Sequence, residues 1–302
     1  MTRIVVTQNL GLSLDQVGRL RKLGQVKTYD RLAKSPEEWL KRCAGADIIC
    51  TGKFGLRDKI YELQNVFIAV PFVGVGWIDQ EKIKQRNIKV ANAPGSNKDA
   101  VAEWITYMIL SLFRRFPVFV NAKKRQWGDI PDATSSLTGK TVTILGRGNI
   151  GTRVGKLCQV FDMDVKYFTR GENLYHVIRD ADVVVDCLSL NPSTRGLLDR
   201  EFFQHMKRGA FFITPTGKEI WDVDALFEAL DKGPLKGAAT DAGSVQVGNI
   251  EDDFYQRLLS HPKLLVTPHI AYNTDITNRV GGDMMISNIR AWLNGKPTNL
   301  YT

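Results

Sequence analysis

The chain has 302 residues, of which 43% are hydrophobic and 24% charged, a composition typical of a globular protein and long enough for two domains that each bury a core. No apolar run reaches membrane-spanning length and no charged-then-apolar leader opens the sequence, so we expect a soluble cytoplasmic protein with no membrane contact. The net charge of +9 comes from dispersed basic residues, which favours solvated helix faces and an anionic cofactor or substrate over a nucleic-acid partner.

The first hundred residues alternate short apolar strands with amphipathic helices. Ser13-Leu-Asp-Gln16 and Ser35-Pro-Glu-Glu38 both have the sequence of a capping box at a helix start. Strands are expected at residues 3–7, 25–29, 47–50, 66–70 and 88–92. This alternation predicts a parallel, doubly wound sheet.

A long apolar helix at residues 99–116, ending before Pro117, separates this series from a second one. The helix is apolar on most faces, which suits burial at a domain junction or a subunit interface. Strands of the second series are expected at 141–145, 163–168, 182–187, 210–214, 236–240 and 264–267, before a last helix at 275–294. The sequence therefore predicts two βα series in tandem. The four cysteines lie in apolar contexts without C-x-x-C or His/Cys metal spacing, which favours reduced core residues and no metal site: Cys43, Cys50, Cys158 and Cys187.

A glycine-rich turn, Gly146-Arg-Gly-Asn-Ile-Gly151, joins the strand at 141–145 to a helix at 149–160. The first glycine permits a tight turn, the second lets a pyrophosphate approach the backbone, and the third lets the helix pack closely on the strand. Phosphates would then lie on the free N–H groups of the helix N-terminus. We therefore predict a dinucleotide site formed by Gly146, Arg147, Gly148, Asn149, Ile150 and Gly151.

Several motifs along the chain resemble those of the D-isomer-specific 2-hydroxyacid dehydrogenases. In order, they are Phe72-Val-Gly-Val-Gly-Trp-Ile-Asp79, Asn92-Ala-Pro-Gly-Ser-Asn97, Val101-Ala-Glu103, Leu137-Thr-Gly-Lys140, the glycine-rich turn, Asn191-Pro-Ser-Thr-Arg-Gly196 and Thr267-Pro-His-Ile-Ala271. The resemblance runs from about residue 45 to the C-terminus. It implies an α/β fold of two Rossmann-like, doubly wound parallel-sheet domains with the active site in a cleft between them.

The resemblance also implies a division of the chain and a set of binding residues. Residues 1–97 with 272–302 would form the flavodoxin-like substrate domain, residues 98–271 would form the dinucleotide-binding domain, and a homodimer would form through the latter and its long helix. The substrate contacts implied are Lys53, Val73, Gly74, Val75 and Asn97, and the positions that line the nucleotide pocket are matched by Asn97, Val101, Thr194, Pro215 and Asp241.

The residues after the second strand of the nucleotide domain bear on which nucleotide binds. NAD-dependent proteins place an acidic residue there, which accepts hydrogen bonds from the adenosine ribose. This sequence instead has Thr169 and Arg170, a hydroxyl and a guanidinium that suit a 2′-phosphate. We therefore expect NADP(H) in preference to NAD(H); the alternative is that Arg170 points into solvent and the site is indifferent.

Hydride transfer to a 2-oxo acid needs a proton donor, a cation on the substrate and a group that orients the donor. The resemblance implies that His269 is the proton donor. Gly217 stands where the family has its arginine, so Lys218, or Lys53, is the remaining candidate for the cation. A lysine offers a point charge without the bidentate geometry of a guanidinium.

The orienting glutamate of the family is also absent, because the matching position holds Gln246. A glutamine can orient an imidazole, but it lacks the charge that would raise the pKa of the histidine. Glu251 or Asp252 could serve instead if the loop differs in length.

These substitutions leave two hypotheses of different classes. The first is an NADP(H)-dependent oxidoreductase of altered site, acting on a small, anionic carbonyl or hydroxyl compound that resembles a 2-hydroxy acid. The second is a catalytically degenerate NAD(P)H-binding sensor or scaffold. Direct nucleic-acid binding has the least support.

Overall fold

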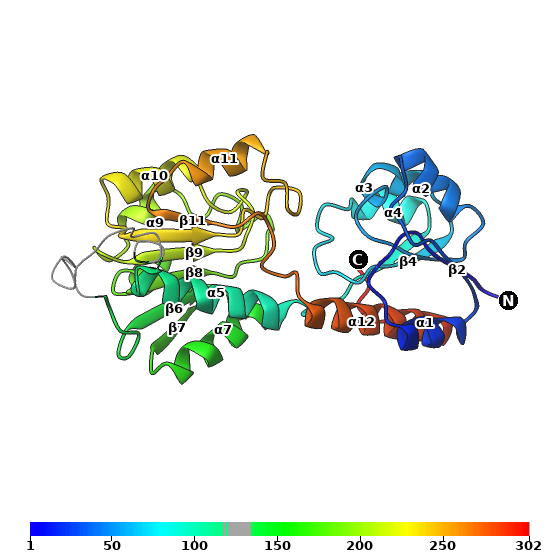
Figure 1. The fold of residues 1–302 in the computed structure, drawn as a ribbon, viewed down its shortest axis with the longest axis horizontal. Helices are drawn as coiled ribbons and strands as arrows, with labels where there is room; N and C mark the ends of the chain where they lie inside the picture. Colours follow the sequence, from blue (N-terminus) through cyan, green and yellow to red (C-terminus); the bar gives the residue numbers. More distant parts are fainter. Residues whose placement is uncertain (117–118, 120–133, 302) are drawn as a thin grey trace. The chain divides into compact units, whose positions relative to one another are not determined.

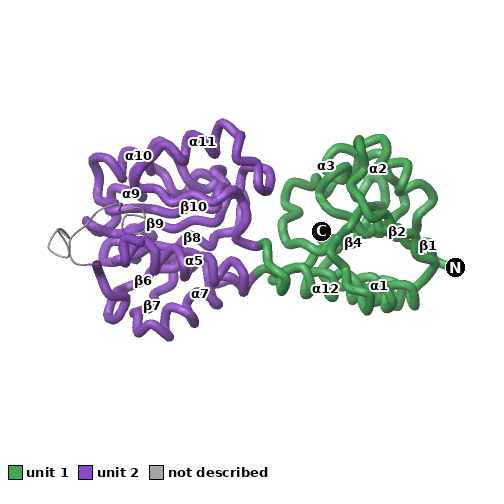
Figure 2. The backbone as a smooth tube through the Cα atoms, viewed as in Figure 1, with its two compact units in different colours: residues 1–97, 273–302 green, residues 98–272 purple. Residues whose placement is uncertain are grey.

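The computed structural model describes residues 1–116, 119 and 134–301 and divides the chain into two compact units (Figure 2). Unit 1 comprises Met1–Asn97 and Asn273–Thr302, and unit 2 comprises Lys98–Tyr272. The second junction lies one residue later than the boundary expected from the sequence. The roles of the units in binding substrate and nucleotide remain predictions, as does a site between them.

Unit 1 is a five-stranded parallel sheet in the order β2-β1-β3-β4-β5 (Figure 1). Its elements are β1 (Arg3–Val6), α1 (Leu14–Arg21), β2 (Gln25–Thr28), α2 (Pro36–Cys43), β3 (Ile48–Cys50), α3 (Leu56–Lys59), the 3₁₀ turn Ile60–Glu62, β4 (Val66–Ala69), α4 (Gln80–Gln85), β5 (Ile88–Ala91) and α12 (Asp275–Leu293). One core lies between the sheet and α2, α3 and α4, and a second lies between the sheet and α1 and α12. Both faces of the sheet are therefore covered, as a parallel sheet requires.

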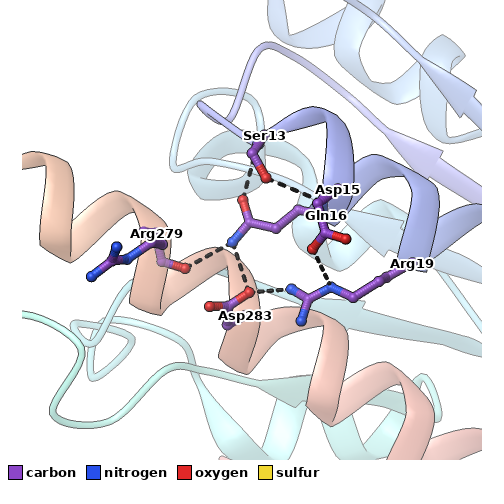
Figure 3. A network of polar contacts seen from close by, with 6 residues as sticks. All are labelled: Ser13, Asp15, Gln16, Arg19, Arg279 and Asp283. Atoms are coloured by element: carbon purple, nitrogen blue, oxygen red, sulfur yellow. Dashed lines mark hydrogen bonds and ion pairs between the residues drawn. The ribbon is translucent and has the colours of Figure 1, made fainter.

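The C-terminal helix α12 is joined to α1 by one glutamine (Figure 3). The side chain of Gln16 accepts from the N–H of Ser13 at 3.0 Å, which closes the capping box predicted at this helix start. The Nε2 of the same residue donates to the carbonyl of Arg279 at 2.8 Å and to Asp283 at 2.9 Å. Arg19 completes the network by pairing with Asp283. Together with the apolar side chains Met285, Ile286 and Ile289, which α12 buries in the second core, these contacts hold the helix in unit 1.

Unit 2 is a six-stranded parallel sheet in the order β11-β10-β9-β8-β6-β7. Its elements are α5 (Lys98–Phe113), β6 (Thr141–Leu145), α7 (Asn149–Val160), β7 (Asp164–Phe168), α8 (Leu174–Ile178), β8 (Val183–Asp186), α9 (Arg200–Gln204), β9 (Phe211–Thr214), α10 (Val223–Asp231), β10 (Gly237–Thr240), α11 (Asp253–Leu259) and β11 (Leu264–Val266). Helices α5 and α7 cover one face, and α9, α10 and α11 cover the other (Figure 1), together with α8, which packs on the same core. The predicted α/β class with two parallel sheets is confirmed.

The strand order of unit 2 places a topological switch point at β6. The chain runs from β6 to β7 on one side of β6 and then returns to β8 on its other side. Ligands of doubly wound sheets bind beyond the carboxyl ends of the strands at such a point. The glycine-rich turn directly follows β6, so the fold brings it to this position.

Two helix ends differ from expectation. Helix α5 ends at Phe113 rather than at residue 116, because Arg115 adopts a left-handed backbone with φ of +49°, which does not continue a right-handed helix. At the start of α2, Ser35 caps the N–H of Glu38, but the Glu38 carboxylate binds the N–H of Lys34 and pairs with Arg42 instead of completing the box. Within the described residues, no helix is both long enough and apolar enough to cross a membrane.

Candidate active site

The first and third glycines of the turn after β6 have the structural roles that the sequence predicted. Gly146 has φ of +96°, a conformation that glycine adopts without strain, and its N–H donates to the carbonyl of Phe168 at 3.2 Å. A Cβ on Gly151 would overlap the carbonyl oxygen of Gly146 and would also press on Ile144. The absence of both side chains therefore sets how closely α7 approaches β6.

The start of α7 has the features that a nucleotide pyrophosphate requires. Gly148 is its N-cap, no side chain caps the first N–H groups, and a Cβ on Gly148 would meet nothing within 4 Å. A hollow of about 540 Å³ opens here, and its lining includes the cationic side chains of Lys98, Arg147, Arg153 and Lys156 and the carboxylate of Asp99. Free N–H groups, a helix dipole and net positive charge all stabilise a bound phosphate. The residues present therefore fit a dinucleotide.

Thr169 and Arg170 follow β7 and are exposed, as a nucleotide contact would need. The sequence did not indicate the partner of Thr169, which is the carboxylate of Glu172. One oxygen of Glu172 accepts from the main-chain N–H of Thr169 at 2.5 Å and from its hydroxyl at 2.9 Å. These two hydrogen bonds hold the pKa of Glu172 below its usual range. An acidic group thus lies next to the expected 2′-phosphate site, supplied from three residues further along.

His269 is held in a tight turn by Asp241, the residue directly after β10. It has φ of +57°, uncommon for a residue other than glycine, and its N–H donates to the carbonyl of Asp241 at 2.9 Å. The buried Asp241 carboxylate accepts from the hydroxyl of Thr267 at 2.5 Å and from the N–H groups of Ile270 and Ala271, both at 2.8 Å. Burial raises the pKa of Asp241 although these donors act against it. Asp241, expected in the nucleotide pocket, therefore acts through its side chain on the turn that carries the histidine.

The imidazole of His269 is oriented by a main-chain group. Its Nδ1 lies 2.9 Å from the carbonyl oxygen of Val245, which can only accept, so Nδ1 carries the proton and Nε2 is the nitrogen that gains or loses a second one. This acceptor is one residue before Gln246, the residue expected to orient the ring. Gln246 itself is exposed, and Glu251 and Asp252 lie further along the loop, where Asp252 caps α11.

The loop after β9 carries Gly217, the residue that the resemblance places at the arginine position of the family. A Cβ on Gly217 would overlap the carboxylate of Glu219, and it would come within 3.1 Å of the Ser244 hydroxyl. That hydroxyl accepts from the N–H of Lys218 at 2.8 Å and donates to Glu219 at 3.3 Å. The ammonium of Lys218 lies 4.6 Å from the ring centre of Phe254. A carboxylate thus lies where a side chain at position 217 would begin, and the Lys218 ammonium contacts an aromatic ring on α11.

The buried carboxylate of Asp186 holds the start of this loop through hydrogen bonds from two threonines. Asp186, at the end of β8, is fully buried and accepts from the hydroxyls of Thr214 at 2.9 Å and Thr216 at 2.5 Å and from the N–H of Leu188 at 3.0 Å. Burial raises its pKa to about 6, although the three donors lower it. From the sequence, this residue was predicted only as part of the strand at 182–187.

Three other predicted nucleotide contacts have different surroundings. Val101 is 4% exposed and belongs to the core between α5, α7 and the sheet. Thr194 is 9% exposed, and its hydroxyl donates to the carbonyl of Ser189 at 2.7 Å. Pro215 is half-buried beside Gly243. The side chains of Val101 and Thr194 therefore lie mainly inside unit 2 rather than on its surface.

The predicted substrate residues all belong to unit 1. Lys53 and the Val73–Val75 loop follow strands β3 and β4, and Asn97 is the last residue of the unit's first segment. The ammonium of Lys53 lies 5.6 Å from the ring centre of Phe72. Burial lowers the pKa of Lys53, and the neighbouring Arg57 lowers it further. In the loop that follows Phe72, Val75 is buried, whereas Gly74 is exposed with open space where a Cβ would lie. Unit 1 therefore presents a partly desolvated cation near an accessible backbone loop.

The carbonyl of Gly74 accepts from the indole N–H of Trp77 at 3.1 Å, and that of Val73 accepts from the side chain of Asn92 at 2.7 Å. These two hydrogen bonds hold the Val73–Val75 loop through its main-chain carbonyl groups. Asn97 is half-buried. In the part of the chain that the structure describes, no three His, Cys, Asp or Glu side chains converge as metal ligands would.

Comparison with known proteins agrees with this architecture. Residues 106–271 match the model of the family "D-isomer specific 2-hydroxyacid dehydrogenase, NAD binding domain". The chain therefore belongs to the D-isomer specific 2-hydroxyacid dehydrogenase family.

Individual relatives span different shares of the chain. A D-3-phosphoglycerate dehydrogenase of Bacillus subtilis is 32% identical over 216 residues, which cover 67% of this chain and 40% of that protein. A glycerate dehydrogenase of Methylorubrum extorquens is 27% identical over 285 residues, 88% of both chains. The crystal structure of the TT0316 protein from Thermus thermophilus has a TM-score of 0.81 at 28% identity and covers 100% of both chains. The match thus spans less than half of the first relative and nearly all of the others.

Proposed function

We propose that the chain is an NADP(H)-dependent oxidoreductase that transfers hydride to or from an anionic carbonyl or hydroxyl compound resembling a 2-hydroxy acid. The observation that carries the proposal is the uncapped start of α7 at the switch point of unit 2, where Gly148 leaves open space above free N–H groups. The family membership supports nicotinamide chemistry at this position. Thr169 and Arg170 support the phosphorylated nucleotide.

A nicotinamide nucleotide, when bound, supplies or accepts the hydride. The chain's own task is then to move a proton and to hold the substrate. Because Nδ1 of His269 donates to the carbonyl of Val245, Nε2 is the atom that gives a proton to the substrate oxygen during reduction and takes it back during oxidation. Asp241 fixes the turn in which the histidine sits, through both carboxylate oxygens. The strained backbone of His269 is thus stabilised by neighbouring hydrogen bonds.

The substrate's negative charge is proposed to be met by Lys53 and by the N–H groups of the Val73–Val75 loop in unit 1. Burial already lowers the pKa of Lys53, and a bound anion would favour its charged form. Lys218 is the second candidate cation, but it would first have to leave the Phe254 ring. We therefore rank Lys53 ahead of Lys218 as the cation that holds the substrate.

One observation favours the second hypothesis, a nucleotide-binding protein without turnover. The carboxylate of Glu219 lies where an arginine side chain at position 217 would begin. A negative charge there would repel the carboxylate of an ordinary 2-oxo acid. Such a protein would bind NADPH and reduce none of the 2-oxo acids tested.

Turnover by wild type and a histidine variant separates the two hypotheses. We expect NADPH oxidation with at least one member of a panel of 2-oxo acids and aldehydes, and a fall in kcat of about 10²- to 10⁴-fold in His269→Gln, with an unchanged Kd for NADPH. His205→Gln is the matched control, because His205 also places Nδ1 2.8 Å from a main-chain carbonyl, that of Glu201, but caps the C-terminal end of α9. Equal activity of His269→Gln and wild type would show that His269 is not the proton donor.

A further inference from the structure

The residues after β7 form a small anion site that the protein fills with its own carboxylate. The main-chain N–H and the side-chain hydroxyl of Thr169 both donate to the same oxygen of Glu172, at 2.5 and 2.9 Å. The backbone closes the same turn, since the N–H of Glu172 donates to the carbonyl of Thr169 at 3.2 Å. Two donors thus converge on one exposed anionic oxygen at the protein surface.

This anion site directly adjoins the nucleotide loop. The carbonyl of Phe168, the residue before Thr169, accepts from the N–H of Gly146, and Phe168 pairs with Leu145 in the sheet. The end of the strand next to the glycine loop is where a doubly wound domain meets the adenosine ribose and any phosphate on its 2′-oxygen. The guanidinium of Arg170 follows at once in the sequence. The donors bound by Glu172 are therefore the donors that a 2′-phosphate would need.

Resting on the proposed nucleotide-binding function, we propose that Glu172 is the residue that sets nucleotide specificity: its carboxylate occupies the 2′-phosphate position in the free protein and must be displaced by NADP(H). The Thr169 donors can bind one anion at a time. Glu172 also places a negative charge beside an incoming phosphate until it swings away into solvent. Glu172 therefore weakens NADP(H) binding and leaves NAD(H), which has no phosphate there, nearly unaffected.

The hydrogen bonds that Glu172 makes support a competitor that is held but can be displaced. They lower its pKa, so the carboxylate is fully ionised at neutral pH. The side chain is exposed, so no core packing retains it. In the opposite role, Glu172 would accept hydrogen bonds from the ribose hydroxyls of NAD(H), as an acidic residue at this position does in other proteins. Removing its charge would then weaken the binding of NADH and not strengthen the binding of NADPH.

Equilibrium titration of the full chain with NADPH and with NADH tests the proposal. We expect the Kd for NADPH to fall about tenfold in Glu172→Gln, because a charged competitor for two hydrogen bonds is removed, while the Kd for NADH changes less than twofold. Asp164→Asn is the matched control, since it removes one exposed carboxylate from the opposite end of β7. In that variant the ratio of the two dissociation constants should stay at its wild-type value.

The same titration in a Thr169→Val background separates competition from a general charge effect. Thr169→Val removes one of the two donors, so the gain from Glu172→Gln should shrink to a few-fold. A parallel change of both dissociation constants in Glu172→Gln, a selective loss of NADH binding, or an undiminished gain in the Thr169→Val background would each overturn the proposal. Failure of wild type and all variants to bind either nucleotide would instead overturn the nucleotide-binding function itself.

Discussion

The buried carboxylate of Asp186 should make the stability of unit 2 depend on pH in an unusual direction. Its pKa in the folded chain is raised from 3.8 to about 6, mainly by burial. The folded state therefore binds the proton more tightly than the unfolded state does. The resulting stabilisation is fully present below the unfolded pKa of 3.8 and is lost as the pH rises through 6.

The size of the effect follows from the shift of the pKa. Each unit corresponds to about 1.4 kcal/mol, so the full loss between low and neutral pH amounts to about 3 kcal/mol. About half of that loss has already occurred at pH 5, which leaves roughly 1 to 2 kcal/mol between pH 5 and pH 8. Asp186→Asn keeps an acceptor for the N–H of Leu188 and can donate to the two threonine hydroxyls, but it does not titrate. Its stability relative to wild type should therefore rise by this amount over the same range.

The assay is urea unfolding of the full chain at pH 5 and pH 8, with the transition of each unit fitted separately. Asp182→Asn is the control, from the residue just before the same strand. Although burial acts to raise it, the pKa of Asp182 is held below its usual value by the ammonium of Lys207 and the N–H of Thr141. Its substitution should change stability equally at both pH values. If the difference between Asp186→Asn and wild type is also the same at both, the raised pKa of Asp186 is refuted.

Two further substitutions test the glycine-rich turn after β6 and the loop after β9 that carries Gly217. Gly151→Ala should cost about 1 to 3 kcal/mol in thermal unfolding and weaken NADPH binding more than tenfold, because its Cβ would overlap the carbonyl of Gly146; unchanged binding would contradict the close packing of α7 on β6. Gly217→Arg should raise kcat/KM for simple 2-oxo acids by about tenfold or more, because the flexible Glu219 side chain can move aside and a bidentate cation is restored. A folded Gly217→Arg protein with wild-type kcat/KM would show that position 217 does not face the substrate.

The sequence was sufficient for the fold and for the geometry of the glycine-rich turn after β6 because both depend on local, repeating chemistry. Apolar strands alternating with capped helices require parallel sheets covered on both faces, and every expected strand is present. The conformations of Gly146 and Gly151 follow from the absence of a side chain, which is visible in the sequence. Helix α5 was predicted too long because the pattern does not show where a left-handed residue ends a helix.

The candidate active site was harder to predict because its contacts involve main-chain atoms or residues outside the motifs identified in the sequence. The acceptor that orients His269 is the main-chain carbonyl of Val245. Because every residue type has such a carbonyl, the sequence does not indicate this contact. Glu172 reaches back three residues to Thr169, and it lies outside the motifs identified in the sequence. Asp186 ends an apolar strand, so only its burial and its threonine partners reveal a buried carboxylate.

The loop from Asp241 to Gln246 connects the separate changes around the candidate active site. At its start the Asp241 side chain holds the turn of His269, and at its end the Val245 carbonyl orients the ring. Between them, the Ser244 hydroxyl binds the N–H of Lys218 and the carboxylate of Glu219, in the loop where the family's arginine is absent. The loop around position 217 is therefore linked through the two hydrogen bonds of Ser244 to the segment that orients His269, the proposed proton donor. For this reason the residues around Gly217 and His269 are better understood as one hydrogen-bonded surface than as independent substitutions, and in the proposed function His269 keeps its role as proton donor beside the carboxylate of Glu219.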